Sequence, residues 1–295
     1  MCRFFKIVFC SLFFGSVGLA RTVTDDLGRT VVIPDLPKRV APLSPYLVET
    51  LYTLGVTPVA RPSSVTYPNE AQTLLDVGLS YKPNLERLLS TQPDLVLIDA
   101  LTQAQLVPSI EKLGVSVVAM DSRSLNDVYR VVGRLGLWLG REQKAKGVER
   151  NIRIAVSKSR AKVQSKPARV FILIGSPQGF FGAKKNSFVG NLLDAVGALN
   201  VATGPDDQRY QGFAPYTFEG LLKANPDVLI VVKPNADPAE AGRSLAAFSK
   251  NPLWNNLKAV KAKRIYELSP EIVLSSPGPR AAEALSELSN LIYPR

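Results

Sequence analysis

Residues 84–98 read NLERLLSTQPDLVLI, and residues 217–230 read TFEGLLKANPDVLI. In both stretches a glutamate, Glu86 in the first and Glu219 in the second, lies seven residues before the proline of a Pro-Asp pair. Each stretch predicts the same series of an N-cap, a short helix, a turn at Pro-Asp and a buried strand. A unit that occurs once in each half of the chain indicates two lobes of similar construction.

Short apolar runs alternate with helical patterns on both sides of these stretches. In the first half, a strand is predicted at Arg39–Leu43, and Ser44 then occupies the N-cap of a helix that starts at Pro45 and ends before Gly55. The other predicted elements are the strands Val115–Met120, Arg169–Ile174 and Val228–Val232 and the helices Ser187–Val196 and Pro279–Ile292. This alternation predicts the α/β class, with largely parallel sheets that are covered on both faces.

The segment between the two halves has a different pattern. From Arg141 to about Gln164 it contains no proline and one glycine, and its apolar residues recur every three or four positions. It predicts one amphipathic helix of roughly 24 residues, about 36 Å long, that joins the lobes. The predicted organisation is an N-terminal lobe at 21–140, a connecting helix at 141–165 and a C-terminal lobe at 166–295. Because the outer positions are basic, a helix on a membrane surface is the alternative.

The first twenty residues have the pattern of an export signal. Residues 1–6 carry two basic residues and no acid, the run from Ile7 to Leu19 is almost wholly apolar, and small residues surround Ala20. We therefore predict a signal peptide at 1–20 that is cleaved near Ala20, and a mature chain in the periplasm.

The two cysteines of the chain, Cys2 and Cys10, both lie inside this predicted signal. The mature chain then has no disulfide, and a hydrophobic core must hold the fold. A lipid anchor on Cys10 is the alternative, but Phe9 is bulky where that cleavage requires a small residue. An uncleaved membrane anchor is a further alternative, although the apolar run is short for one.

Composition excludes several function classes. The chain has 36 Lys and Arg against 25 Asp and Glu, a formal net charge of +11, which suits an anionic ligand or surface. Nucleic acid is not expected as a partner, since the basic residues are spread along the chain. The absence of histidine excludes a Ser-His-Asp or Cys-His catalytic site and the usual zinc sites. Carboxylate pairs at Asp25-Asp26 and Asp206-Asp207 remain for catalysis, but adjacent acids favour solvated turns, and we expect no enzyme.

A series of short motifs follows in order along the chain after residue 20. They are Asp26-Leu27-Gly28-Arg29, Ile33-Pro34, Pro37-Lys38-Arg39-Val40, Gly55-Val56-Thr57-Pro58-Val59, Val77-Gly78, Asn186-Ser187-Phe188, Gly197 with Asn200-Val201, Pro252-Leu253-Trp254 and Pro277-Gly278-Pro279-Arg280. With the two Glu-bearing stretches, the series resembles the helical-backbone (class III) substrate-binding proteins of ABC importers for ferric siderophores, haem and cobalamin. The resemblance implies two Rossmann-like α/β lobes joined by a single long helix, a ligand cleft between the lobes and little hinge motion.

The resemblance also implies partners. In this family one glutamate on each lobe contacts arginines of the permease, and Glu86 and Glu219 occupy those positions. Two carboxylates, one on each lobe, suit a two-fold permease through charge-assisted pairs. The alternative is that each only complements a helix N-terminus. The implied partners are an ABC permease with its ATPase subunits and a small metal chelate. The chain is expected to be a monomer without a cofactor.

Ligands of this family contact loops at the strand ends of both lobes. Aromatic faces suit the apolar parts of a chelate, and Arg or Lys suits its anionic oxygens. A surface or packing role is the alternative for each candidate. The predicted ligand-binding residues are Tyr46, Arg61, Tyr67, Tyr81, Lys82, Phe181, Lys184, Tyr210, Phe213 and Arg280, with Asp99, Phe180 and Lys185 on the same loops.

The identity of the chelate stays open between three classes. Hydroxamate-binding relatives place an arginine three residues before the proline of the Pro-Asn-Leu-Glu run, where this chain has Ser80. Haem would need a tyrosine such as Tyr46 or Tyr67 as axial ligand, because histidine is absent. Cobalamin fits a pocket lined by Tyr and Phe. The basic charge and the Gly-Arg and Pro-Lys-Arg opening favour an anionic ferric siderophore.

Overall fold

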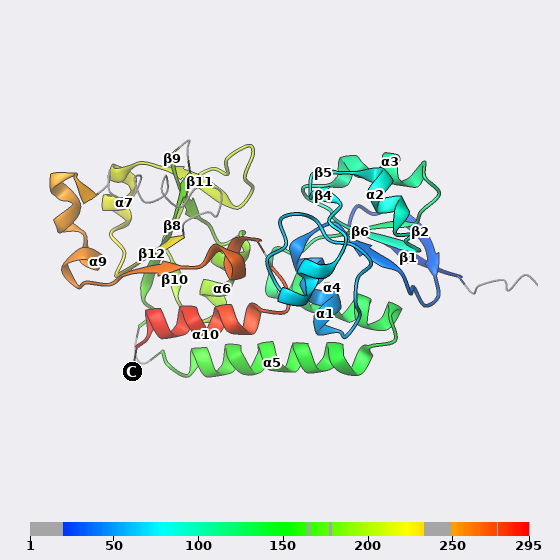
Figure 1. Cartoon of the computed structure of the whole chain (residues 1–295). Helices are drawn as coiled ribbons and strands as arrows, with labels where there is room; N and C mark the ends of the chain where they lie inside the picture. Colours follow the sequence, from blue (N-terminus) through cyan, green and yellow to red (C-terminus); the bar gives the residue numbers. More distant parts are fainter. Residues whose placement is uncertain (1–19, 164–165, 177–178, 233–248, 276, 295) are drawn as a thin grey trace, which may run out of the picture.

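The computed structural model describes residues 20–163, 166–176, 179–232, 249–275 and 277–294. Two α/β lobes lie side by side, and the long helix α5 (Glu142–Arg160) runs along both of them (Figure 1). The predicted signal peptide lies outside the described residues, except for Ala20, which begins the first strand. Within the described residues, no helix combines the length and the apolar character needed to span a membrane.

The N-terminal lobe is built on a three-stranded parallel sheet in the order β3-β6-β7. All residues of β6 up to Ile98 are buried, as expected for a central strand covered on both faces. Two antiparallel hairpins, β1 with β2 and β4 with β5, flank the sheet. The elements of this lobe are β1 (Ala20–Thr24), β2 (Thr30–Pro34), β3 (Val40–Pro42), α1 (Pro45–Thr53), β4 (Gly78–Leu79), β5 (Lys82–Pro83), α2 (Leu85–Ser90), β6 (Leu95–Asp99), α3 (Val107–Glu111), β7 (Val117–Met120) and α4 (Leu125–Trp138).

The C-terminal lobe contains a larger sheet in the order β11-β9-β8-β12-β13, with β10 also paired to β8. Strands β8, β10, β12 and β13 run parallel, whereas β9 and β11 are antiparallel to their neighbours. The elements of this lobe are β8 (Arg169–Ser176), β9 (Gly179–Ala183), α6 (Phe188–Ala195), β10 (Leu199–Asn200), β11 (Phe213–Tyr216), α7 (Phe218–Ala224), β12 (Val228–Val232), α9 (Lys258–Lys261), β13 (Ile265–Leu268) and α10 (Ala281–Ile292). The predicted bounds of the strands and of the helices α1, α6 and α10 differ from the observed bounds by at most two residues.

The two Glu-bearing stretches fold alike, which confirms the duplication. Asn84 and Thr217 are the N-caps of α2 and α7, and their side chains accept the backbone N–H of Arg87 (2.9 Å) and Gly220 (3.2 Å). Capping of this kind satisfies one of the free N–H groups at a helix start. Both helices therefore begin where the sequence predicts.

The Pro-Asp turns that follow these helices also share their hydrogen bonds. The side chain of Asp94 accepts the N–H of Arg39 (3.0 Å), and the side chain of Asp227 accepts the N–H of Arg169 (3.0 Å). The carbonyls of Arg39 and Arg169 in turn accept the N–H groups of the two aspartates. Each turn thus attaches its strand to the first strand of the same sheet. The aspartate in each Pro-Asp pair is therefore a structural residue.

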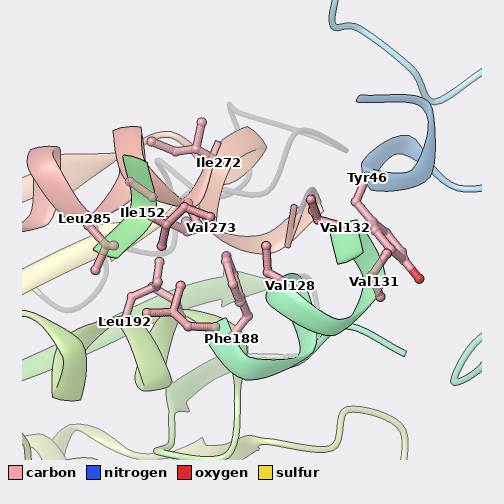
Figure 2. Packing of buried hydrophobic residues seen from close by; sticks show 14 of the residues in the cluster. Tyr46, Val128, Val131, Val132, Ile152, Phe188, Leu192, Ile272, Val273 and Leu285 are labelled. Atoms are coloured by element: carbon pink, nitrogen blue, oxygen red, sulfur yellow. The ribbon is translucent and has the colours of Figure 1, made fainter. Parts of the chain in front are cut away.

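One apolar core continues from lobe to lobe through α5. Ile152 of α5 lies in the same cluster as Val128 of α4, Phe188 and Leu192 of α6 and Leu285 of α10 (Figure 2). Well-packed interiors resist deformation. The lobes are therefore joined by a packed layer of four helices in addition to the covalent link through α5.

Helix α5 ends earlier than the sequence pattern predicts, at Arg160 instead of about Gln164. The N–H groups of Lys162 and Val163 bond back by three residues, to the carbonyls of Ser159 and Arg160, both at 3.1 Å. This tighter turn brings Val163 onto Gly197, where an added Cβ would lie 2.9 Å from the valine. Packing against the second lobe, which the sequence pattern does not contain, sets the end of the helix.

The expectation of a solvated turn at Asp25-Asp26 is wrong. The Asp25 side chain is fully buried and accepts hydrogen bonds from the N–H groups of Leu27, Arg29 and Ala119 and from the Arg29 guanidinium. Burial alone would raise the pKa of Asp25, but the hydrogen bonds from Arg29 and Ala119 outweigh burial and hold that pKa below its usual 3.8. The carboxylate therefore fastens the β1–β2 hairpin to β7.

Replacement of this carboxylate should destabilise the protein and change its response to acid. Because the folded-state pKa of Asp25 is lowered, its contribution is fully present above about pH 4 and is lost as the pH falls through the folded-state value. We expect Asp25→Asn to cost about 3 kcal/mol at pH 7 and to make the loss of stability below pH 4 less steep. Urea unfolding followed by tryptophan fluorescence measures both. Asp35→Asn removes a half-exposed partner of Arg21 and should cost below about 1 kcal/mol; equal costs for the two variants would contradict the assignment.

Candidate functional site

A cavity of about 250 Å³, the inner cavity, lies between the two lobes. The loops that follow β3, β6 and β7 form its first wall, because the carboxyl ends of parallel strands meet at one edge of a sheet. The second wall comes from the start of α6, from the segment at β11 and from the segment before α10. The first wall consists of Ser44, Tyr46, Asp99, Leu101, Thr102, Asp121, Ser122 and Arg123, and the second of Asn186, Ser187, Phe188, Gln211, Phe213, Val273, Leu274 and Pro277.

A wider hollow of about 630 Å³, the outer hollow, shares Asp121, Arg123 and Asn186 with the inner cavity. Charged side chains line it and are largely paired with one another. Asp26 pairs with Arg134 (2.7 Å) and Arg130 (3.2 Å). The remaining lining residues are Ser124, Asp127, Lys185 and Asn191. Because they share these three lining residues, the two spaces adjoin, and together they give room for a ligand larger than the inner cavity alone.

Direct contacts cross between the lobes around the inner cavity. The Ser122 hydroxyl donates to the carbonyl of Pro277 (2.5 Å), and the Asn191 side chain accepts the N–H of Leu125 (2.9 Å). At the rim, the Arg123 guanidinium lies 3.5 Å from the Gln211 side-chain oxygen. Ser44 occupies the N-cap of α1 as predicted, but its side chain makes no capping bond and lines the inner cavity.

The charge of the inner cavity differs from that of the chain. Among the residues that the structure describes, three charged ones line it, the acids Asp99 and Asp121 and the base Arg123. Arg123 donates through Nε to both oxygens of Asp121 (2.9 Å each), and this contact raises the pKa of the arginine. Burial raises the pKa of Asp99 despite hydrogen bonds from Thr102, and Asp121 adds to the effect. The positive charge of the chain is therefore not concentrated in the inner cavity.

Tyr46 and Phe213 are the predicted ligand residues that line the inner cavity. Tyr46 is 2% exposed, and its hydroxyl donates to the carbonyl of Met120 (2.9 Å). Burial raises the pKa of this hydroxyl well above 10, and the acids Asp99 and Asp121 add to the effect. In Figure 2 the hydroxyl points away from the other labelled side chains. Tyr46 thus presents its ring to the cavity side and uses its hydroxyl within its own lobe.

Three predicted basic ligand residues have carboxylate partners. Arg61 lies 3.4 Å from Asp76, and Lys184 lies 2.5 Å from Asp206. Arg280 contacts Glu283 (2.9 Å) and lies 3.9 Å from the buried Glu49 of the other lobe. Lys185, on the rim of the outer hollow, pairs with Asp194 (2.7 Å).

The remaining predicted residues lie at separate places. Tyr81 and Lys82 are exposed at the β4–β5 turn, and Phe180 packs against the core of the second lobe. Phe181 is buried in β9, with its ring edge against Tyr210 at a centroid distance of 5.5 Å.

Tyr67 and Arg280 meet across the two lobes. The Arg280 guanidinium lies over the Tyr67 ring, 4.4 Å from its centroid, while the tyrosine remains 46% exposed. Arg280 follows Pro277 of the inner cavity by three residues, so this contact lies close in sequence to the cavity wall. Tyr67 is a half-exposed tyrosine with a cation against its face.

Glu86 and Glu219 are both exposed, on α2 and α7. The two helices lie on the side of the molecule away from α5, one on each lobe (Figure 1). A hydrogen bond from its own backbone N–H lowers the pKa of Glu219, and the Thr217 side chain adds to the effect. Glu219 therefore also contributes to the helix start, and both glutamates are available on one face.

Sequence reasoning missed Arg123, Asn186 and Gln211. Arg123 lies in the loop after β7, at the same edge of the sheet as Asp99 at the end of β6. The rule that ligands bind at the carboxyl ends of parallel strands could therefore have found it. Gln211 and Asn186 reach the cavity from polar loops of the second lobe, for which the sequence offers no periodic signal. Within the described residues, no group of three or more His, Cys, Asp or Glu side chains is arranged to hold a metal ion.

A family model described as periplasmic binding protein matches residues 40–272. The uncharacterized ABC transporter substrate-binding lipoprotein YvrC of Bacillus subtilis is 29% identical over 283 residues, which cover 92% of this chain and 85% of YvrC. The high-affinity heme uptake system protein IsdE of Staphylococcus aureus is 27% identical over 259 residues, covering 86% of this chain and 87% of IsdE.

Solved structures agree with the fold. The crystal structure of Staphylococcus aureus IsdE complexed with heme matches with a TM-score of 0.74 and 26% identity, over 86% of this chain and 98% of IsdE. Staphylococcus aureus SirA complexed with staphyloferrin B matches with a TM-score of 0.76 and 19% identity, over 92% of this chain and 98% of SirA. At that identity, the second match shows the fold alone.

Proposed function

The chain belongs to the periplasmic binding protein family, and we propose that it captures a ferric siderophore between its lobes and delivers it to an ABC permease. The observation that carries the proposal is the inner cavity, which is lined by loops of both lobes and shares three lining residues with the outer hollow. Ligand sites in open α/β sheets lie at this edge. A protein that captures its ligand outside the cytoplasmic membrane must be exported, and this agrees with the predicted signal peptide.

The chemistry of the lining favours a chelate that brings a complete set of ligands to its iron. The chain has no histidine. Within the described part of the chain, Tyr46 is the single tyrosine that lines the inner cavity, and its hydroxyl is bonded to the carbonyl of Met120. The cavity then contributes aromatic contact from Phe188 and Phe213 and a cation from Arg123. A siderophore needs these contacts and no metal ligand from the protein.

Haem is the second candidate, because Tyr67 provides a half-exposed phenol on a loop between the lobes. A tyrosine can serve as an axial ligand of haem iron. The Arg280 guanidinium beside this ring could also pair with a carboxylate of the haem. The similarity to IsdE, described as a heme uptake protein, is in keeping with this candidate.

Titration with a small panel tests both candidates on the same protein. We expect a ferric catecholate or hydroxamate siderophore to raise the free energy of unfolding by about 2.7 kcal/mol at a hundredfold excess over its Kd, in wild type and in Tyr67→Phe alike. Stabilisation by haemin in wild type that is lost in Tyr67→Phe would select the second candidate. Stabilisation by cyanocobalamin alone would replace both. No shift with any of these ligands would contradict the chelate proposal.

The proposed partners are the permease and its ATPase subunits, with the α2–α7 side as the docking face. Glu86 and Glu219 lie exposed on that side, one on each lobe (Figure 1). Carboxylates on two points of a rigid body fix both position and orientation against a basic partner surface. The packed core between the lobes keeps the two points in register.

A further inference from the structure

The outer face of α5 is basic and largely unpaired. Lys146, Arg150 and Lys158 are exposed, and within the described residues none of the three makes an ion pair. Arg153 is paired with Glu149 at 2.7 Å. A strongly amphipathic helix with basic residues on its outer positions is typical of contact with an anionic surface.

This face forms an outer edge of the molecule. Helix α5 is straight and lies along one long side, with both lobes on its other side (Figure 1). Its 19 residues give a ridge about 28 Å long at about 1.5 Å per residue. Two hollows border it, one lined by Lys146, Glu149, Arg150, Arg153, Ile154 and Ser157 and the other lined in part by Lys158 and Lys162. The cations therefore follow the ridge from one lobe to the other.

We propose that this ridge binds a membrane surface with anionic phospholipid headgroups. Each Lys or Arg close to such a surface is attracted by its negative potential, without insertion of the helix. Ile154, 45% exposed, lies among the cations and can contact the acyl boundary of a lipid surface. A soluble polyanion would leave that side chain in water, which is why the lipid surface fits the face better.

Binding through the ridge also orients the molecule. Because α2 and α7 lie on the side away from α5 (Figure 1), a membrane that contacts the ridge cannot at the same time contact Glu86 and Glu219. A molecule held in this way exposes its docking face to the solvent. The ridge and the docking face are thus separate surfaces. Binding of a membrane to the ridge can therefore be tested without a chelate or a permease.

The test is co-sedimentation of the purified full chain with vesicles. We expect binding to vesicles of 30% phosphatidylglycerol in phosphatidylcholine at about 50 mM salt, and little binding to phosphatidylcholine alone. The triple variant Lys146→Gln, Arg150→Gln, Lys158→Gln should bind about a hundredfold more weakly, roughly fivefold for each cation removed. Binding should also fall as salt is raised, since exposed charges are screened.

A matched variant changes the same net charge elsewhere. Lys112 is exposed directly after α3, and Lys258 and Lys261 are exposed on α9. Their replacement by Gln should leave vesicle binding within about twofold of wild type. Because all variants share the same N-terminal segment, any contribution from it cancels. Equal loss in both triple variants would overturn the proposal, as would equal binding to neutral vesicles. Soluble polyphosphate can be added to displace the protein from the vesicles. If it binds the protein more strongly than vesicles do at the same phosphate concentration, the ridge is assigned to a soluble polyanion instead.

Discussion

Cells that carry the double variant Glu86→Lys, Glu219→Lys should lose chelate uptake by more than about a hundredfold, while the purified variant binds the chelate with unchanged Kd. Both side chains are exposed and lie outside the inner cavity and the outer hollow, so their reversal leaves the ligand site intact. Removal of one partner from a desolvated interfacial charge pair costs about 2–5 kcal/mol, and reversal adds repulsion to that loss. Radiolabelled chelate uptake and in vitro titration measure the two quantities separately.

The control for this variant reverses two exposed acids on other parts of the molecule. Glu70→Lys with Glu142→Lys changes the net charge by the same amount, away from α2 and α7, and should leave uptake within about twofold of wild type. The two variants should also unfold at similar urea concentrations, because exposed charges contribute little to stability. Uptake that survives the reversal of Glu86 and Glu219 would show that both residues serve only their own helix starts.

The fold was predictable because its signals are local. The caps at Asn84 and Thr217 and the apolar runs act within their own stretch of chain, and the structure uses each of them. The Pro-Asp turns are also marked by adjacent residues, although their aspartates then bond to Arg39 and Arg169, far along the chain. The sequence pattern places the end of α5 too late, because a residue of the other lobe, Gly197, determines the turn there. Local pattern predicts an element, and long-range packing decides where the element stops.

The ligand site was less predictable, because charge balance is not local. Arg61, Lys184 and Arg280 have the residue types that bind anions, yet each has a carboxylate partner that no pattern in the sequence reveals. For Arg280 that partner is Glu49, in the opposite half of the chain. The sequence shows that a basic residue is on a loop, but only the fold shows whether its charge is already neutralised. Arg123 escaped notice although it lies only three residues after the end of a predicted strand.

Arg123→Glu should weaken the binding of an anionic ferric siderophore by at least about a hundredfold. Among the described residues that line the inner cavity, Arg123 is the single cation; it also borders the outer hollow and, although paired with Asp121, is still half-exposed. At about 5 Å and an effective dielectric constant of about 20, each unit of charge changes the interaction by about 3 kcal/mol, and the reversal changes two units. Its side chain is 47% exposed, so the fold should tolerate the change. Arg209→Glu, which alters a more exposed arginine outside both spaces, is the matched control.

The opposite result would carry as much information. If Arg123→Glu leaves affinity unchanged or raises it, the ligand is neutral or cationic, and the acids Asp99 and Asp121 are the groups that select it. The pH dependence distinguishes the two cases independently, because burial raises the pKa of Asp99. As the pH falls through that raised pKa, Asp99 loses its negative charge. An anionic chelate then binds more tightly at the lower pH, whereas a cationic one binds more weakly. Titration of wild type as the pH is lowered from 7 through the raised pKa of Asp99, with a chelate that is stable over that range, therefore fixes the sign of the ligand charge without any substitution.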